Sequence, residues 1–210
     1  MELHELIFPY RLIIRGGIGL PRARQMISRS GSFATNGFRT MLDRMLKSAR
    51  LNGTNFLLLK EDSTATGQAL VVLALAGTSF GIGFTMSIGF TSLWVLVGAF
   101  VGAVIAIVLG FVWVSLTFLI GTRIFRATSD YWSLARPVFF ATSPGLVFLL
   151  MSIPVSFVAD VARAVGVAWI AISTVIAAKA ALGIDSQRSI MTFILVAFIV
   201  LISYGLVSSL

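Results

Sequence analysis

No charged residue stands between Asp62 and Arg123, so residues 63–122 form an uninterrupted stretch of 60 uncharged positions. A transmembrane helix needs about 20 apolar residues, because it rises about 1.5 Å per residue and the hydrocarbon core of a bilayer is about 30 Å thick. The stretch therefore has room for two spans or for three short ones. The whole chain is 58% hydrophobic and 11% charged, with a mean hydropathy of +0.99, which excludes the soluble globular class. The sequence predicts a multispanning membrane protein.

Polar and helix-breaking residues divide the apolar sequence into five predicted spans. Residues 87–92 are the least helical part of the uncharged stretch and separate the first span from the second. Pro154 ends the third span, and Pro144 within it is expected to kink that span or to begin a re-entrant segment. Gly183 and Asp185 end the fourth span. The spans are expected at 66–87, 95–121, 137–153, 161–182 and 189–207.

The basic residues give the predicted spans an orientation. Cytoplasmic loops of membrane proteins carry an excess of Lys and Arg. With five spans and a cytoplasmic N-terminus, fifteen of the 16 Lys and Arg residues lie inside and Arg163 alone lies outside. Three spans in the uncharged stretch would move the loop between Arg123 and Arg136 to the outside and weaken this asymmetry. The predicted fold class is therefore all-α, an integral bundle of five transmembrane helices over residues 66–210, with the C-terminus outside.

Residues 1–65 are predicted to form a cytoplasmic or interfacial arm that contains an amphipathic helix at 36–51. In this segment apolar residues recur at helical spacing and basic residues lie on the opposite face. Such a helix is typical of the membrane interface, where each basic residue near anionic lipid contributes about 1 kcal/mol. Docking onto a partner protein is the alternative. The residues expected to contact the membrane surface or a partner are Phe38, Arg39, Met41, Leu42, Arg44, Met45, Lys47 and Arg50.

Small residues recur at four-residue intervals in the second predicted span and again in the first. This spacing places them on one face of a helix, where another backbone can approach closely. Packing between the spans of one chain is the simplest interpretation, and a dimerisation face or a groove for a partner helix or lipid is the alternative. The predicted helix-packing residues are Gly77, Gly81, Gly98, Gly102, Ala106 and Gly110.

Residues that build catalytic and metal sites are scarce in this chain. It has no Cys, a single His at position 4 and eight acidic residues, and no ionisable side chain falls at the centre of a predicted span. Hydrolase, nucleotide-binding and zinc-protease patterns do not occur in a workable context. We therefore expect no enzyme activity, no cofactor and no metal site, while bound lipids remain possible. The net charge of +8 borders long apolar runs, which favours anionic lipid over nucleic acid as the partner.

Three stretches in the second half of the chain carry a family resemblance. They are RPVFFATSP at 136–144, WIAI at 169–172 and AAKAALGI at 177–184. Over about residues 66–205 the chain resembles bacterial-type five-span members of the Yip family, the Ypt/Rab-interacting-protein domain. The resemblance implies an integral protein of a prokaryotic cytoplasmic membrane, with a cytoplasmic N-terminus and no catalytic residues. The Asp-Leu-Tyr-Gly-Pro type signature of eukaryotic members is absent, so no role with Rab GTPases is implied.

Three functional hypotheses follow from these features. The first is a non-catalytic, Yip-like membrane scaffold or adaptor protein. The second is an accessory subunit of a larger membrane assembly, such as a respiratory or photosynthetic complex, in which the small-residue face and the arm contact other subunits. The third is a small transporter or channel. The first two imply membrane lipids and other integral membrane subunits as partners.

Overall fold

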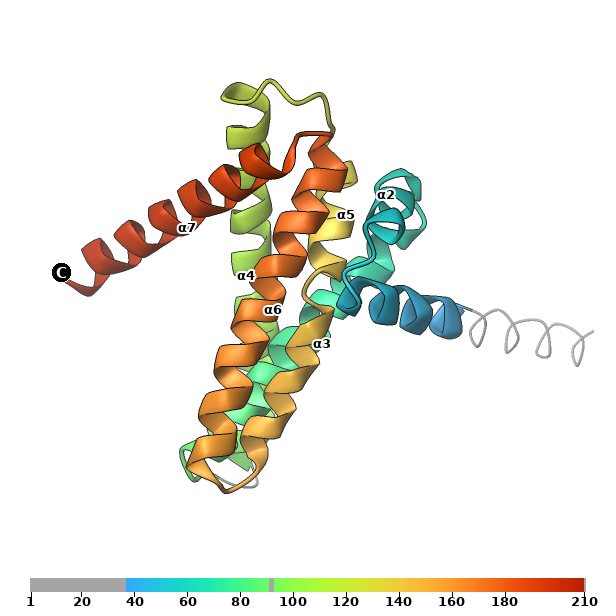
Figure 1. Cartoon of the computed structure of the whole chain (residues 1–210). Coiled ribbons are helices and arrows are strands. Elements are labelled where there is room, and N and C mark those ends of the chain that lie inside the picture. The colour runs from blue at the N-terminus through green and yellow to red at the C-terminus, as the bar shows by residue number, and fades with distance from the viewer. Residues whose placement is uncertain (1–36, 91–92, 210) are drawn as a thin grey trace, which may run out of the picture. The chain divides into compact units, whose positions relative to one another are not determined.

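A computed structural model of the chain describes residues 37–90 and 93–209, and every element within these ranges is a helix (Figure 1). Contacts divide the chain into two units, Met1–Met41 and Leu42–Leu210, and the contacts discussed below lie within the second unit. Five helical segments are long and apolar enough to cross a membrane: Ala65–Ser87, Leu93–Arg123, Tyr131–Ser152, Ser156–Leu182 and Ser186–Ser203. The all-α, five-span fold class is confirmed, and the protein is an integral membrane protein.

The chain order is a helix over residues 37–49, a short helix, and then the spans. Asn52 caps the short helix, because its side chain accepts a hydrogen bond from the Asn55 backbone N–H. We call residues 42–61 the helical hairpin. The elements are α2 (Gly53–Glu61), α3 (Ala65–Ser87), α4 (Leu93–Arg123), α5 (Tyr131–Phe140), the 3₁₀ helix η1 (Ser143–Ser152), α6 (Ser156–Leu182) and α7 (Ser186–Ser208).

The third and fourth spanning segments begin six and five residues earlier than the sequence indicated. The third, expected from residue 137, begins at Tyr131, because the Asp130 carboxylate accepts a hydrogen bond from the Ser133 N–H at 3.0 Å and caps α5. Pro137 therefore lies inside α5 instead of opening it. The fourth, expected from residue 161, begins at Ser156 and takes in the exposed ion pair of Asp160 with Arg163 at 3.8 Å. Exposed charges near a helix end do not stop the helix, since solvent or headgroups receive them.

Helices α3 and α4 approach each other at backbone-to-backbone distance. A Cβ atom at Gly81 would lie 2.0 Å from the Gly98 carbonyl oxygen, and one at Gly102 would lie 2.3 Å from the Gly77 carbonyl oxygen. Such distances are possible only where no side chain intervenes. The predicted helix-packing residues thus meet one another within one chain, with Ala106 against Gly77. Gly110 lies against the Leu73 side chain.

The 3₁₀ helix η1 fills the space between α3 and α6. A Cβ at Gly83 would lie 2.1 Å from the Phe148 carbonyl oxygen, and a Cβ at Gly166 would lie 2.5 Å from the Phe148 ring. Phe148 and Met151 of η1 pack with Ala159 and Ala162 of α6 in a buried apolar cluster. A 3₁₀ run of ten residues is unusually long, and its narrower cross-section lets η1 lie between two glycine-lined faces.

The last helix, α7, leaves the bundle after its first turns. Ser189, Thr192 and Val196 are fully buried, and the Ser189 hydroxyl donates to the Val175 carbonyl oxygen of α6 at 2.7 Å. In Figure 1, α7 then runs away from α4 and α6. Most of the large apolar side chains beyond Val196 that the structure describes are exposed: Phe198, Ile199, Leu201, Ile202 and Leu206.

Candidate docking surfaces

A set of hydrogen bonds and one ion pair, which we call the polar junction, ties the helical hairpin to the spans. The Arg44 guanidinium forms an ion pair with Asp62 at the end of α2 and donates to the Gln68 side-chain oxygen of α3 at 2.8 Å. The side chains of Arg44 and Asp62 are 20% and 29% exposed, so water screens this pair only partly. Arg44 was expected to face the membrane surface or a partner, and the structure instead engages it inside the chain.

Arg136 of α5 completes the polar junction from the other side. The residue is only 8% exposed, and its Nη1 donates to the Lys60 carbonyl oxygen at 2.6 Å. Its Nε donates to the Thr66 hydroxyl at 3.0 Å. The last carbonyls of a helix have no partner within the helix, so a buried guanidinium at the end of α2 satisfies one of them. Arg136 therefore holds the end of α2 and the start of α3 against α5.

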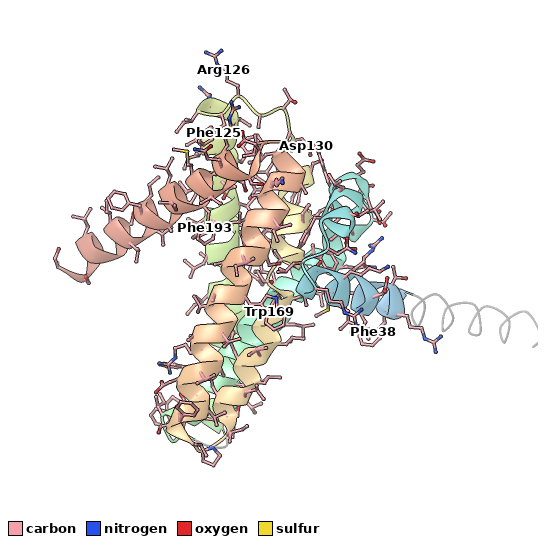
Figure 2. All side chains as sticks on the ribbon, in the orientation of Figure 1. Phe38, Phe125, Arg126, Asp130, Trp169 and Phe193 are labelled. Carbon is pink, nitrogen blue, oxygen red and sulfur yellow. The ribbon has the colours of Figure 1, made fainter. Side chains whose placement is uncertain are left out.

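Two further hydrogen bonds fix the hairpin beside the spans. The Ser143 hydroxyl donates to the Met45 carbonyl oxygen at 3.1 Å, and the Trp169 indole donates to the Ala49 carbonyl oxygen at 2.9 Å (Figure 2). Trp169 is the central residue of α6, thirteen positions from Ser156 and thirteen from Leu182. The hairpin thus lies alongside the middle of α6 and not beyond its end. This contact of Trp169 was not expected from the sequence.

The two helices of the hairpin are joined by a buried amide. The Asn55 side chain donates to the Ser48 hydroxyl at 2.9 Å and to the Arg44 carbonyl oxygen at 3.2 Å. Ser48 is fully buried, as is Phe56 of α2. The inner face of the first helix therefore carries Arg44 and Ser48 together with Met45 of the predicted apolar stripe, whereas Leu42 and Leu46 of that stripe are exposed.

Ionised Asp62 stabilises the polar junction. The pKa of Asp62 is held below its ordinary value because the Thr64 hydroxyl and N–H and the Arg44 guanidinium donate to its carboxylate, while partial burial acts in the opposite direction. A depressed folded-state pKa means that the stabilisation is present above the unfolded pKa of about 3.9 and is lost as pH falls through the folded value.

Acid is therefore expected to loosen the hairpin. We expect the backbone amides of residues 42–61 to exchange hydrogen faster at about pH 3 than at about pH 6, after correction for the intrinsic pH dependence of exchange. The matched control is Asp62→Asn, in which exchange is already fast at the higher pH and the difference shrinks. Equal corrected rates in the unaltered protein at both values would show that Asp62 does not hold the hairpin.

Four leucines of the hairpin are exposed alongside its charged residues. Leu46 and Leu58 are 59% and 66% exposed, and Leu42 and Leu57 are also exposed. Of the predicted contact residues, Met45 is buried and Lys47 pairs with Asp43 at 2.6 Å. Arg50 is exposed, whereas Phe38, Arg39 and Met41 belong to the first unit, where Phe38 is exposed. We call Leu42, Leu46, Leu57 and Leu58 the leucine face.

An apolar groove of about 750 Å³ runs between α4 and α6. Phe84 of α3, Val101 of α4 and Ile170 of α6 line it, and Phe193 of α7 lies beside Trp113 at one end. No charged residue lines it. The hydroxyl of Thr85, which also lines it, donates to the Gly81 carbonyl oxygen of its own helix at 2.7 Å, so the groove offers a ligand an apolar wall.

The leucine face and the groove are the candidate docking surfaces. In the part of the chain that the structure describes, no three His, Asp or Glu side chains come together in a group that could hold a metal ion. Comparisons of the chain with known protein families, with curated proteins and with solved structures found no match.

Proposed function

We propose that the protein is a non-catalytic membrane scaffold or adaptor of the Yip type, whose leucine face binds an integral membrane partner. The observation that carries this proposal is the combination of a hairpin fixed by the polar junction with four exposed leucines on its outer side. Hydrogen bonds to charged groups contribute about 1.5–3 kcal/mol each. A hairpin held by several of them presents its outer face in a single arrangement, which lowers the entropic cost of binding.

The residues behind the family resemblance support the same proposal. Arg136 and Ser143 belong to the stretch 136–144, and Trp169 opens the stretch 169–172. All three donate hydrogen bonds to the hairpin region: to the carbonyl oxygens of Lys60, Met45 and Ala49. The Yip-like stretches thus include the side chains that hold the docking element, which is what a scaffold requires of its spans.

The charge of the hairpin favours a protein partner over anionic lipid. Residues 42–62 contain four basic side chains and three acidic ones. Two of the basic side chains, Arg44 and Lys47, pair with Asp62 and Asp43. The electrostatic attraction to anionic headgroups is correspondingly smaller than a count of basic residues alone would give.

A photocrosslinking residue placed at Leu46 tests the proposal in the native membrane. We expect a discrete protein adduct from Leu46 that is lost when Arg136→Met releases the hairpin. The matched control is Phe100 of α4, which is 71% exposed and remote in sequence from the hairpin, and which should yield lipid adducts. Lipid adducts alone at Leu46 would contradict a protein-binding face.

An accessory subunit and a scaffold differ in the stoichiometry of the complexes that they form with their partners. Native mass spectrometry after gentle solubilisation separates the two, because an accessory subunit co-purifies with one complex at a fixed ratio. We expect substoichiometric recovery of the Leu46 partner. Recovery at a constant ratio with a single assembly would contradict the scaffold hypothesis and support the accessory-subunit hypothesis.

A further inference from the structure

Besides the leucine face, two exposed apolar surfaces in the described part of the second unit deserve comparison. One is the groove between α4 and α6. The other is the second half of α7, where Phe198 and Leu201 are 60% and 68% exposed and Ile194 and Ile202 are also exposed. Unpartnered apolar surfaces on a membrane protein meet either lipid or another helix, and close packing with a helix is favoured where small residues permit it.

The two surfaces match in length and chemistry. Residues 194–208 of α7 extend for about 22 Å at about 1.5 Å per residue. The groove follows α4 from Trp94 to Trp113, a distance of about 28 Å on the same rise. Neither surface carries a charge, and the groove presents exposed apolar side chains of α4, among them Val97, Val101 and Ile105.

The helix α7 cannot enter the groove of its own chain without giving up its packed first half. The Ser189 hydroxyl donates to the Val175 carbonyl oxygen, and the ring centroid of Phe193 lies 5.1 Å from that of Trp113. Sharp kinks in helices occur at Pro, at Gly or at inserted groups. Residues 186–204 contain no Pro and no Gly, and Gly205 is too near the end to redirect the helix.

We propose that two copies of the chain exchange their last helices. The second half of α7 from one copy lies in the groove between α4 and α6 of the other, and the reverse contact completes a two-fold dimer. A reciprocal contact of this kind closes on itself and buries both surfaces at once. The groove begins where Phe193 already packs on α4, so the new contact continues the existing α4–α7 interface.

The absence of Cys from the chain gives this proposal a clean test. Two single variants, Val101→Cys in the groove and Phe198→Cys on α7, are co-expressed with tags of different size and oxidised in the membrane. We expect a disulfide-linked species that carries both tags. A disulfide requires Cα atoms within about 7 Å, so its formation reports direct apposition.

Val104→Cys provides the matched control. Val104 and Val101 lie on the same helix and are 43% and 44% exposed, but only Val101 lines the groove. Pairing Val104→Cys with Phe198→Cys should give no mixed-tag species. Equal crosslinking of both positions would overturn the proposal, because it would show random collision.

Two further outcomes would also overturn the exchange. In a chain carrying both Val101→Cys and Phe198→Cys, a disulfide formed only within single chains would mean that α7 fills its own groove. A monomer in native mass spectrometry that shows no crosslink would leave the groove to lipid or to a different protein. A blocking variant gives an independent readout, since Val101→Trp should weaken dimerisation about tenfold or more while Val104→Trp leaves it unchanged.

Discussion

Replacement of Gly81 by Ala is expected to destabilise the protein by about 3 kcal/mol, near the upper end of the range for overpacking a well-packed interior. The new methyl group would lie 2.0 Å from the Gly98 carbonyl oxygen and 2.7 Å from its carbonyl carbon. A backbone carbonyl cannot rotate away as a flexible side chain does. The two helices must therefore separate along their contact, and the loss is measured as a lower midpoint of thermal or denaturant unfolding in a fixed detergent.

The same substitution at Gly67 is expected to stabilise the protein instead of destabilising it. Gly67 lies in α3 as Gly81 does, but a Cβ there would meet nothing within 4 Å. Ala lowers the backbone entropy of the unfolded chain and favours helix, so Gly67→Ala is expected to stabilise by about 0.5–1 kcal/mol. Equal effects at the two positions would be incompatible with the close approach of α3 and α4.

Replacement of Arg136 by Met is expected to cost about 3 kcal/mol and to free the hairpin. The change removes a buried cation together with its two hydrogen bonds. It also leaves the Lys60 carbonyl oxygen without its donor. Loss of one hydrogen bond to a charged group costs about 1.5–3 kcal/mol, and an orphaned buried acceptor adds to that. Met keeps most of the apolar stem, so the effect isolates the guanidinium.

Hydrogen exchange locates the effect of the Arg136 variant. Amides of residues 53–66 should lose protection, while those of α4 keep theirs, because local opening confines the change to the released element. Arg126→Met is the control, since Arg126 is exposed in the connection between α4 and α5 and points away from the helices (Figure 2). Uniform loss of protection across the chain would instead indicate global unfolding.

Local spacing predicted the parts of the fold that depend on one helix at a time. The four-residue repeat of small side chains identified Gly98 and Gly102 as packing residues, and the structure sets them against Gly77 and Gly81. The amphipathic segment expected at 36–51 is a helix over 37–49. Periodicity is a property of consecutive residues, so it can be recognised without knowledge of the tertiary structure.

The contacts that fix the hairpin could not be predicted from the spacing of residues along one helix. Arg136 meets the Lys60 carbonyl oxygen across 76 residues, and Trp169 meets the Ala49 carbonyl oxygen across 120. Both acceptors are backbone groups, which have no side-chain signature in the sequence. One available signal was overlooked: Asp130 stands three residues before Ser133 and marks a helix start ahead of Pro137.

The sequence did not indicate which residues of the amphipathic helix face the spans. Met45 and Leu46 are adjacent and both apolar, yet Met45 is buried and Leu46 is exposed. The choice follows from Ser48, whose hydroxyl accepts from Asn55 and directs that side of the helix inward. A polar residue with a buried hydrogen-bond partner can face inward in place of an apolar residue. The partner is known only from the tertiary structure.

Helix α4 is longer than the hydrocarbon core of a bilayer is thick, so the tilt of this helix depends on bilayer thickness. Its 31 residues extend for about 46 Å, against a hydrocarbon core of about 30 Å. Helices relieve such a mismatch by tilting, by thickening the lipid around them or by extending into the headgroups. Since α3 is in backbone contact with α4 at Gly81 and Gly98, both helices must tilt together. A thicker membrane therefore brings this pair more upright, and the chain is expected to partition toward thicker, more ordered lipid.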